Sequence, residues 1–457
     1  MVTMNKTKLK FSQFPKKYLY TSILIFLIKV FIILNINPNF TLDIGNGQGF
    51  YLRGILNGSD GENYLAGLLA LKSQGIFSQN SILSYFPAGY PILMFALSIF
   101  GIGWTMTILS ILQSALFSFA VFYFVRQLFT TKLQKFVFLV FLAILLNPTL
   151  TLSSLVVGYE SLVASGHLLI LGILIKDLKT KEEGKSNSIR SLILVSLICS
   201  IISFLQPRLI LGILLVIFFW VITSFKSRII YSLFIAVLIS SIFPTSLVFR
   251  NYQASNLFAI STNLGTTMNL GAGNFTTGGY WDERKGELCN VNESKENKDI
   301  SVVRCVLKWY LNNPIKTASL FYHKSIYFWS PWIGPNAEGT SGRNPWLRYG
   351  PLEVLNDKES FIQIIQGGFG KFISALWQIF SLFFLFYGLI NIYKLRNLER
   401  QIGVMSMILI LVNWGICLLT IGDHRFRLPI LGISVFLQIV GLQFLLRRKL
   451  KDILMEH

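Results

Sequence analysis

The stretch IIYSLFIAVLISSIFPTSLVF, residues 229–249, carries no charged side chain. An α-helix rises about 1.5 Å per residue, so roughly 20 apolar residues cross the hydrocarbon core of a bilayer. The rest of the chain has the same character, because 53% of its 457 residues are hydrophobic and 14% are charged. No ordinary soluble core could bury so much apolar surface. The sequence therefore predicts an integral membrane protein.

Further apolar stretches predict a bundle of about ten membrane-spanning helices, so the expected fold class is an all-α membrane protein. The first stretch follows a run of lysines, as in a signal peptide, but it has no small-residue cleavage site. We therefore expect it to be retained as a span. The spans are expected at residues 18–36, 104–125, 136–150, 152–175, 190–206, 209–224, 229–249, 372–393, 402–421 and 428–446.

The formal net charge of +20 is concentrated in the turns between these spans. If the chain begins in the cytoplasm and crosses at each span, every basic cluster falls on the cytoplasmic side, which satisfies the positive-inside rule. Short turns offer no basic surface with interleaved aromatic groups, so we expect no nucleic-acid partner. We expect a multi-pass protein of the bacterial cytoplasmic membrane. The clusters contain Arg126, Lys132 and Lys135; Lys176, Lys179, Lys181, Lys185 and Arg190; Lys226 and Arg228; Lys394, Arg396 and Arg400; and Arg447, Arg448, Lys449 and Lys451.

The apolar segment from Pro87 to Phe100 is not expected to cross the membrane. Counting it as a span would move every later basic cluster to the outside. It is also short for a crossing and contains a second proline, Pro91, near its start. We expect a re-entrant or interfacial segment.

These assignments divide the chain into five parts. Two outward segments are too long to be simple turns, and such loops are usually functional. The cytoplasmic turns contain no Gly-rich phosphate loop, which argues against a nucleotide-driven transporter. The expected parts are a basic N-terminus and first span (1–36), a first outward loop (37–103), a transmembrane bundle (104–249), a second, partly folded outward loop (250–371), and the C-terminal spans with a basic tail (372–457).

Two motifs stand in order in the first outward loop, SDGENYLA at residues 59–66 and YFPAGYP at residues 85–91. Their order resembles the first loop of the GT-C glycosyltransferases, in particular the bacterial group related to protein O-mannosyltransferases and the lipid A aminoarabinose transferase. Phe86 and Ala88 depart from the flanks of that group's proline motif. The positions that match are Asp60, Tyr64, Gly89, Tyr90 and Pro91.

Later segments are similar to the same group. The second outward loop contains RNY (250–252), ISTNLG (260–265), GN (273–274) and TGGY (277–280), and an Asn-Pro pair follows at 313–314. The sequence DHRFRLP, residues 423–429, resembles the turn that precedes the group's last span. Each motif alone is weak, but the ordered set covers nearly the whole chain.

The resemblance implies a GT-C-type membrane enzyme. It would move a monosaccharide, with inversion, from a polyprenyl-phosphate donor to an acceptor lipid, glycan or protein on the extracytoplasmic face. Its partners would be that donor, membrane lipids and the acceptor. Two alternatives stay open: a ligase or polymerase that uses lipid diphosphate donors, and a flippase or other transporter of lipid-linked sugars. The ligase would need no aspartate in the first loop, and the transporter would need charges lining the bilayer middle.

The proposed transfer needs a base near the acceptor hydroxyl. Asp60 is the candidate, because the resemblance places the catalytic acid–base residue of the superfamily at this position. An alternative interpretation is that Asp60 caps a helix that begins at Gly61. Glu160 is a second acid, at the outer end of an expected span, where an ionisable group is costly. It is expected to hold a divalent metal ion together with Asp60, to position a sugar hydroxyl, or to lie in the headgroup layer.

The departing phosphate needs cations, and guanidinium groups suit it through paired hydrogen bonds. Arg425 and Arg427 are the first candidates and Arg208 is the third. Binding of lipid headgroups is the alternative for all three.

Cys289 and Cys305 share one outward loop, so we predict a disulfide between them. Other candidates for contacts with the substrates are Glu62, Tyr64, Tyr90, Asn263, Asn274, His323, Lys324 and His424.

Overall fold

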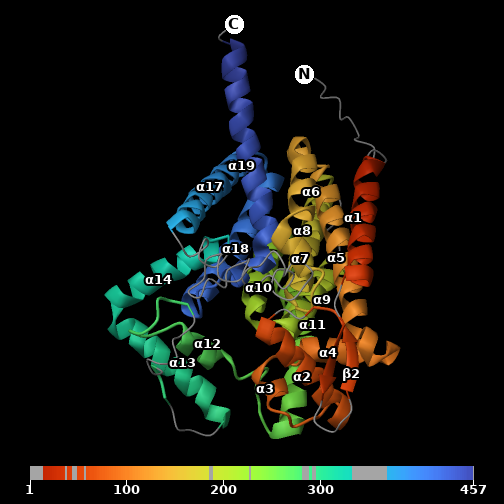
Figure 1. Ribbon diagram of the computed structural model, residues 1–457. Coiled ribbons are helices and arrows are strands. Elements are labelled where there is room, and N and C mark those ends of the chain that lie inside the picture. The colour runs from red at the N-terminus through yellow and green to blue at the C-terminus, as the bar shows by residue number, and fades with distance from the viewer. Residues whose placement is uncertain are drawn as a thin grey trace.

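The protein is an all-helical, multi-pass membrane protein, as the sequence predicts (Figure 1). The computed structural model describes residues 14–36, 39–43, 49–55, 58–184, 189–225, 228–279, 288–290, 295–331 and 368–455. Within these residues, eight helical segments are long and apolar enough to cross a membrane. They contain α1 (Lys16–Ile36), α5 (Thr105–Leu128), α8 (Glu160–Glu182), α10 (Ile210–Ser224), α11 (Ile229–Ser255), α17 (Gly368–Tyr393), α18 (Asn397–Leu419) and α19 (Leu428–Met455).

Two of the ten expected spans differ from the structure. The expected span at 136–150 is divided into α6 (Val137–Leu145) and α7 (Pro148–Ser153), because proline has no N–H to continue a helix. The side chain of Asn147 caps α7 by accepting a hydrogen bond from Leu150 N at 3.1 Å. The boundary at 152–175 is wrong, since α8 begins only at Glu160. A further expected span, α9 (Ile189–Leu205), is an apolar helix of 17 residues.

Residues 154–159, between α7 and α8, are not helical and lie inside the bundle. Non-helical backbone at such a place needs protein partners for its polar groups. The side chain of Gln113 donates to Val156 O at 2.7 Å, and Gly158 N donates to the hydroxyl of Tyr90 at 2.8 Å. Val157 N donates to Ile55 O at 2.9 Å. These hydrogen bonds stabilise the non-helical conformation of the chain as far as Glu160, the first residue of α8.

The first outward segment forms a hairpin and three helices below the bundle in Figure 1. Strands β1 (Asn39–Asp43) and β2 (Gly49–Arg53) pair antiparallel, and α2 (Gly58–Gln74), α3 (Ile82–Tyr85) and α4 (Gly89–Leu97) follow. Helix α4 is only 9 residues long and packs against α2 and α5. A helix of that length cannot cross a bilayer. The interfacial or re-entrant placement of this segment stays a prediction.

The second outward segment forms a separate helical substructure on the left of Figure 1. It contains α12 (Leu264–Leu270), α13 (Lys295–Asn312) and α14 (Pro314–Trp329). Its small core includes Met268, Val306 and Leu320. A disulfide joins Cys289 to Cys305, with the two Cα atoms 6.2 Å apart. Apolar burial and the disulfide together fix a substructure that has few other elements to pack against.

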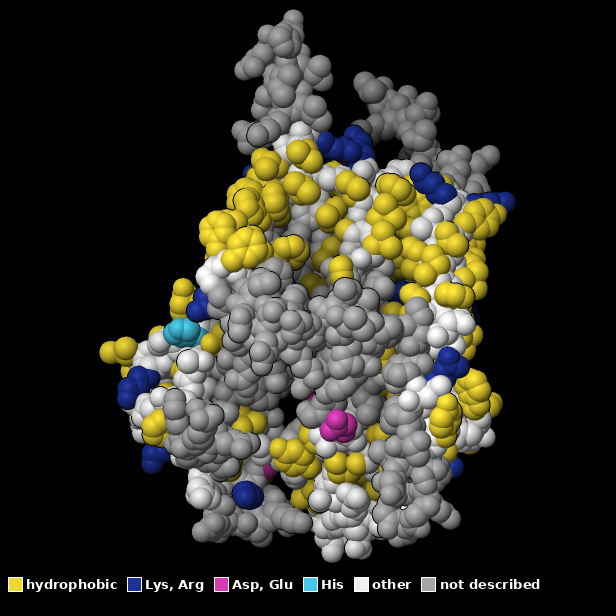
Figure 2. Space-filling view, in the orientation of Figure 1, with side chains coloured by type: hydrophobic (Ala, Val, Ile, Leu, Met, Phe, Trp, Pro, Cys, Tyr) yellow, Lys and Arg dark blue, Asp and Glu magenta, His cyan; other side chains and the backbone are white. Residues whose placement is uncertain are grey.

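The two ends of the bundle differ in charge. At one end, Lys132 N donates to the carboxylate of Glu399 at 2.9 Å, and Lys181 bonds to Thr223 O near the end of α10. The basic turns therefore meet at this end. At the other end, the starts of α2, α8 and α19 meet around acidic side chains. Hydrophobic side chains cover much of the upper part of the molecule in Figure 2.

Candidate active site

A cavity of about 170 Å³ lies at the end of the bundle opposite the basic turns. Residues 60–87, the α9–α10 turn, residues 263–270 and the turn that precedes α19 all contribute to its wall. Its polar and aromatic groups are the kind that bind a small polar ligand. The lining residues are Asp60, Tyr64, Tyr85, Phe86, Pro87, Tyr159, Leu205, Gln206, Arg208, Asn263, Thr267, Leu270, Ile421, Arg425 and Phe426.

Asp60 lies on this wall with its side chain 28% exposed. It is the third residue of α2, which begins at Gly58, so it is not the N-cap of a helix beginning at Gly61. A carboxylate in the first turn of a helix is stabilised by the positive end of the helix dipole. The carboxylate is therefore held at the cavity by a rigid element and is open to a ligand.

Arg425 joins Asp60 to Glu160, although the two acids lie in distant parts of the chain. Its Nη1 atom donates to Asp60 Oδ2 and its Nε atom donates to Glu160 Oε1. Arg425 belongs to the 3₁₀ helix η8 (His424–Arg427), whose first N–H groups are capped by Asp423 at 3.0 Å. The Glu160 side chain is 2% exposed, so this carboxylate is buried and paired. We refer to Asp60, Glu160 and Arg425 as the cavity triad.

A second guanidinium lies on the same wall. Arg208, in the 3₁₀ turn η4 (Pro207–Leu209), donates to the hydroxyl of Tyr159 at 3.0 Å. Gln206 donates to the same hydroxyl at 2.8 Å. The Arg208 guanidinium stacks 3.7 Å from the centre of the Phe426 ring, which fixes its plane. Arg208 and Arg425 therefore line the same cavity. Tyr159 lies between the groups that hold the two guanidinium groups in place.

Two tyrosines from the first outward segment pack behind the cavity triad. The rings of Tyr64 and Tyr90 lie 4.9 Å apart, and only Tyr64 lines the cavity. Burial raises the pKa of both hydroxyls well above their ordinary value, and neighbouring carboxylates add to the rise. Both therefore stay protonated at neutral pH, and the Tyr90 hydroxyl donates to Gln113 at 2.9 Å. Tyr90 thus positions the segment before Glu160.

Arg427 does not share the cavity with Arg425. Its Nη1 atom donates to Trp329 O at 2.8 Å, and its guanidinium lies 5.7 Å from the centre of the Trp329 ring. Its donors are directed at the last residues of α14. The predicted role of Arg427 at the donor phosphate is not tested by these contacts. The contacts themselves are those of a structural residue.

Lys324 is not part of the cavity wall either. It is fully buried in α14 and donates to the hydroxyl of Tyr310 at 3.0 Å, to Leu418 O at 2.9 Å and to Thr420 O. Burial lowers the pKa of this ammonium to about 7. The contacts cap the C-terminal end of α18. We refer to Lys324 and Arg427, with the carbonyl groups that they bind, as the α14 lock.

The remaining candidates are distributed as follows. Asn263 lines the cavity, whereas Glu62 is exposed on α2 and is not part of its wall. Asn274 accepts a hydrogen bond from Lys316 at 3.0 Å, and His323 contacts Ser319 O at 2.8 Å. His424 is buried beside Asp423, with Nδ1 3.0 Å from Oδ1. Only Asn263, among these five residues, is in place to contact a ligand in the cavity.

The residues do not favour a metal ion between Asp60 and Glu160. Arg425 binds both carboxylates, so a guanidinium takes the position that a shared cation would need. Nowhere in the described part of the chain do three or more His, Cys, Asp or Glu side chains gather at a distance suited to metal binding. The protein itself supplies the cation that bridges the two acids.

Residues of this site that sequence reasoning missed include Gln113, Tyr159 and Gln206. Gln113 is fully buried in α5, where it supports the open segment before α8. A single amide within an apolar span is a signal, because a polar group at that depth needs a partner. Gln206 precedes Pro207 at the end of α9, where the helix stops and side chains turn toward the cavity.

Comparison with known proteins adds no relative. No protein-family model matches the chain, and no curated protein matches it. The fold and the cavity therefore define the class on their own, a multi-pass helical membrane protein with a charged cavity at one end of its bundle.

Proposed function

We propose that the protein is a membrane glycosyltransferase of the GT-C type. It moves a monosaccharide from a polyprenyl-phosphate donor to an acceptor hydroxyl on the extracytoplasmic face of the cell membrane. The observation that carries the proposal is the cavity itself, where a partly exposed carboxylate and two guanidinium groups lie on one wall. One group type suits proton removal and the other suits a phosphate.

The step balances with these groups alone. The acceptor oxygen attacks the anomeric carbon while its proton passes to the Asp60 carboxylate. The bond between that carbon and the phosphate oxygen breaks, and the polyprenyl phosphate leaves with the electron pair. Arg208 and Arg425 stabilise the charge that develops on the phosphate. Asp60 returns its proton to water through the open side of the cavity.

Arg425 has a further part in this proposal. A carboxylate held by a guanidinium is a poor base, and Asp60 is held in this way by Arg425. The Arg425 Nη2 atom is buried and has no hydrogen-bond partner in the described residues, so it has an unused N–H donor to offer a phosphate oxygen. A donor phosphate would compete with Asp60 for Arg425. Donor binding would thus release Asp60 as a base, while Glu160 keeps Arg425 in place.

The charge distribution supports the assigned side of the membrane. The basic turns meet at one end of the bundle and the cavity lies at the other. The positive-inside rule assigns the basic end to the cytoplasm. Cysteines at Asn274, beside the cavity end, and at Glu183, at the basic end, test this. We expect an impermeant thiol reagent to label Asn274→Cys in intact cells and to spare Glu183→Cys; the reverse pattern would overturn the orientation.

Activity is tested with purified protein in lipid nanodiscs and a panel of polyprenyl-phosphate-linked hexoses and pentoses. We expect at least one donor to lose its sugar, with free polyprenyl phosphate as the second product. Asp60→Asn should abolish this release, while Glu62→Gln, an exposed change on the same helix, should not. If the donors stay intact but are carried across the membrane of vesicles that contain the protein, the protein is a transporter and not a transferase.

A further inference from the structure

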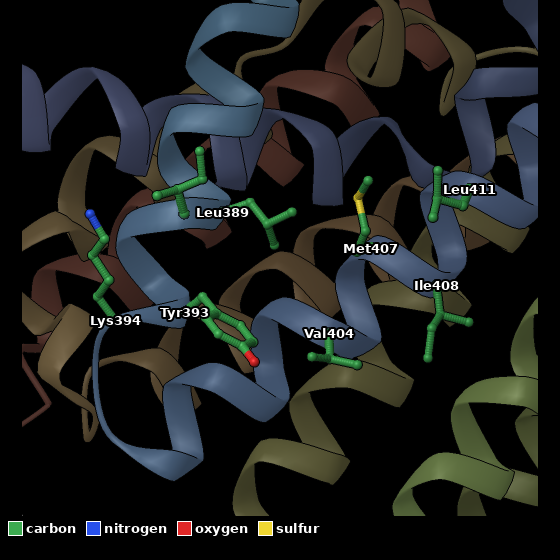
Figure 3. Close-up of a pocket in the computed structure, with 8 residues that line it drawn as sticks. Leu389, Tyr393, Lys394, Val404, Met407, Ile408 and Leu411 are labelled. Carbon is green, nitrogen blue, oxygen red and sulfur yellow. The ribbon is translucent and has the colours of Figure 1, made fainter.

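A second hollow lies far from the cavity, between α17 and α18. It is an open groove of about 410 Å³. Figure 3 shows Tyr393 and Lys394 at one end of it, Ile408 and Leu411 at the other, and Leu389 and Met407 between them. The groove is lined by Leu389, Ile390, Tyr393, Lys394, Val404, Met407, Ile408 and Leu411.

The lining is apolar along its length and basic at one end. Val404, Met407, Ile408 and Leu411 follow the spacing of a single helix face on α18. Lys394 is the one charged residue of the lining. An apolar channel that ends at a cation is complementary to an acyl chain that ends at an anion.

Further positive charge lies at the same end. The guanidinium of Arg400 lies 4.8 Å from the centre of the Tyr393 ring and donates to Tyr393 O at 3.3 Å. Arg396 is exposed in the turn between the two helices. The one acid of this turn, Glu399, is buried and accepts a hydrogen bond from Lys132 N. The exposed charges at the mouth are therefore all positive.

The side of the groove formed by α18 is shorter than one leaflet. From Val404 to Leu411 the helix rises about 10.5 Å, at 1.5 Å per residue. One leaflet contributes about 15 Å of hydrocarbon. The groove therefore covers the larger part of one acyl chain.

We propose that this groove is a binding site for an anionic phospholipid of the leaflet at the basic end. One acyl chain lies along α18 between Val404 and Leu411, and the phosphate is bound by Lys394 and Arg400. A polyprenyl phosphate is not the expected occupant, because the cavity with Asp60 lies at the opposite end of the bundle. The proposal is independent of the transferase activity.

Native mass spectrometry of the full chain, stripped of lipid and titrated with phosphatidylglycerol or phosphatidylcholine, tests the site. We expect one phosphatidylglycerol to bind more tightly than phosphatidylcholine. Each basic residue near an anionic surface contributes roughly 1 kcal/mol, or about five-fold in affinity. The double change Lys394→Gln with Arg400→Gln should therefore weaken phosphatidylglycerol about 25-fold and leave phosphatidylcholine unchanged. Arg228→Gln, an exposed basic residue at the same end, is the matched control.

A second variant tests the groove itself. Met407→Trp fills it, so binding of phosphatidylglycerol should be lost, whereas Ile379→Trp, exposed on α17 outside the groove, should bind as the unmodified chain does. Equal affinity for both phospholipids, unchanged binding by the double charge variant, or a preference for polyprenyl phosphate would each overturn the proposal. The charge variant decides the matter if Met407→Trp does not fold, because it alters only exposed side chains.

Discussion

The cavity triad and the α14 lock both contain buried cations, but they bind different partners. Arg425 binds two carboxylate side chains from α2 and α8, and one of these, on Asp60, is partly exposed. Lys324 and Arg427 bind mainly backbone carbonyl groups, at the ends of α18 and α14. Carboxylates and a phosphate compete for the same guanidinium, whereas backbone carbonyls at a helix end have no other donor. A buried cation that binds a side-chain carboxylate can thus exchange this partner for a ligand. A buried cation that binds backbone carbonyl groups has a structural role.

The largest expected effect is on Asp60, the exposed member of the triad. Asp60→Asn keeps the shape but removes the base, so turnover in the transfer assay should fall by about 10²- to 10⁴-fold. Apparent Tm and donor binding should stay near those of the unmodified protein. Turnover equal to that of Glu62→Gln would remove Asp60 from the mechanism.

The contrast between Arg425 and Arg427 is the sharpest test of the comparison. Arg425→Gln should lower kcat/KM for the donor by on the order of 100-fold, because a group that stabilises developing charge is lost. Arg427→Gln should leave kcat/KM within a few-fold but destabilise the fold by about 2 kcal/mol through lost hydrogen bonds. Measurements of kcat/KM and of thermal unfolding for both variants distinguish the two roles. Equal kinetic defects would mean that the two arginines form one phosphate site after all.

Substitution of Glu160 should lower turnover less than substitution of Asp60 or Arg425 does. Glu160→Gln keeps a hydrogen-bond acceptor for Arg425 and removes only the charge, worth about 1.4 kcal/mol or roughly ten-fold in turnover. Treatment of the unmodified protein with a chelator should not reproduce this loss, since the guanidinium of Arg425 and not a metal ion bridges the two acids. Partial rescue of Glu160→Gln by added divalent ion would contradict the guanidinium bridge and favour a metal site.

The last expected effect is on stability and not on turnover, and it concerns pH and the α14 lock. Burial lowers the pKa of Lys324 to about 7, from an ordinary value of 10.5. Between these values the unfolded chain holds a proton that the folded chain has released, so stability rises with pH across this window. The Tm of the unmodified protein should therefore rise relative to Lys324→Met between pH 7 and pH 9. A constant difference, or one that falls, would show that the ammonium form is retained.

The fold class and several site residues could be predicted from the sequence. Composition and the repeated apolar stretches predict helical spans. The resemblance of the first loop singles out Asp60, and the cost of an ionisable group at the outer end of a span singles out Glu160. The break between α7 and α8 could not be placed, because the stretch around Gly158 is as apolar as a span. Its conformation depends on Gln113 and Tyr90, which lie 43 and 68 positions from their partners.

The sequence by itself determined that the chain is a helical membrane protein with basic residues gathered in alternate turns, since both depend on local composition. Only the tertiary structure decided which groups Arg425 and Arg427 contact. The two residues lie in one 3₁₀ turn of about three residues per turn, so side chains two positions apart point about 120° apart. One therefore reaches Asp60 and Glu160, and the other reaches the end of α14. Which partner each arginine meets depends on elements more than 90 residues away, and no local pattern encodes that distance.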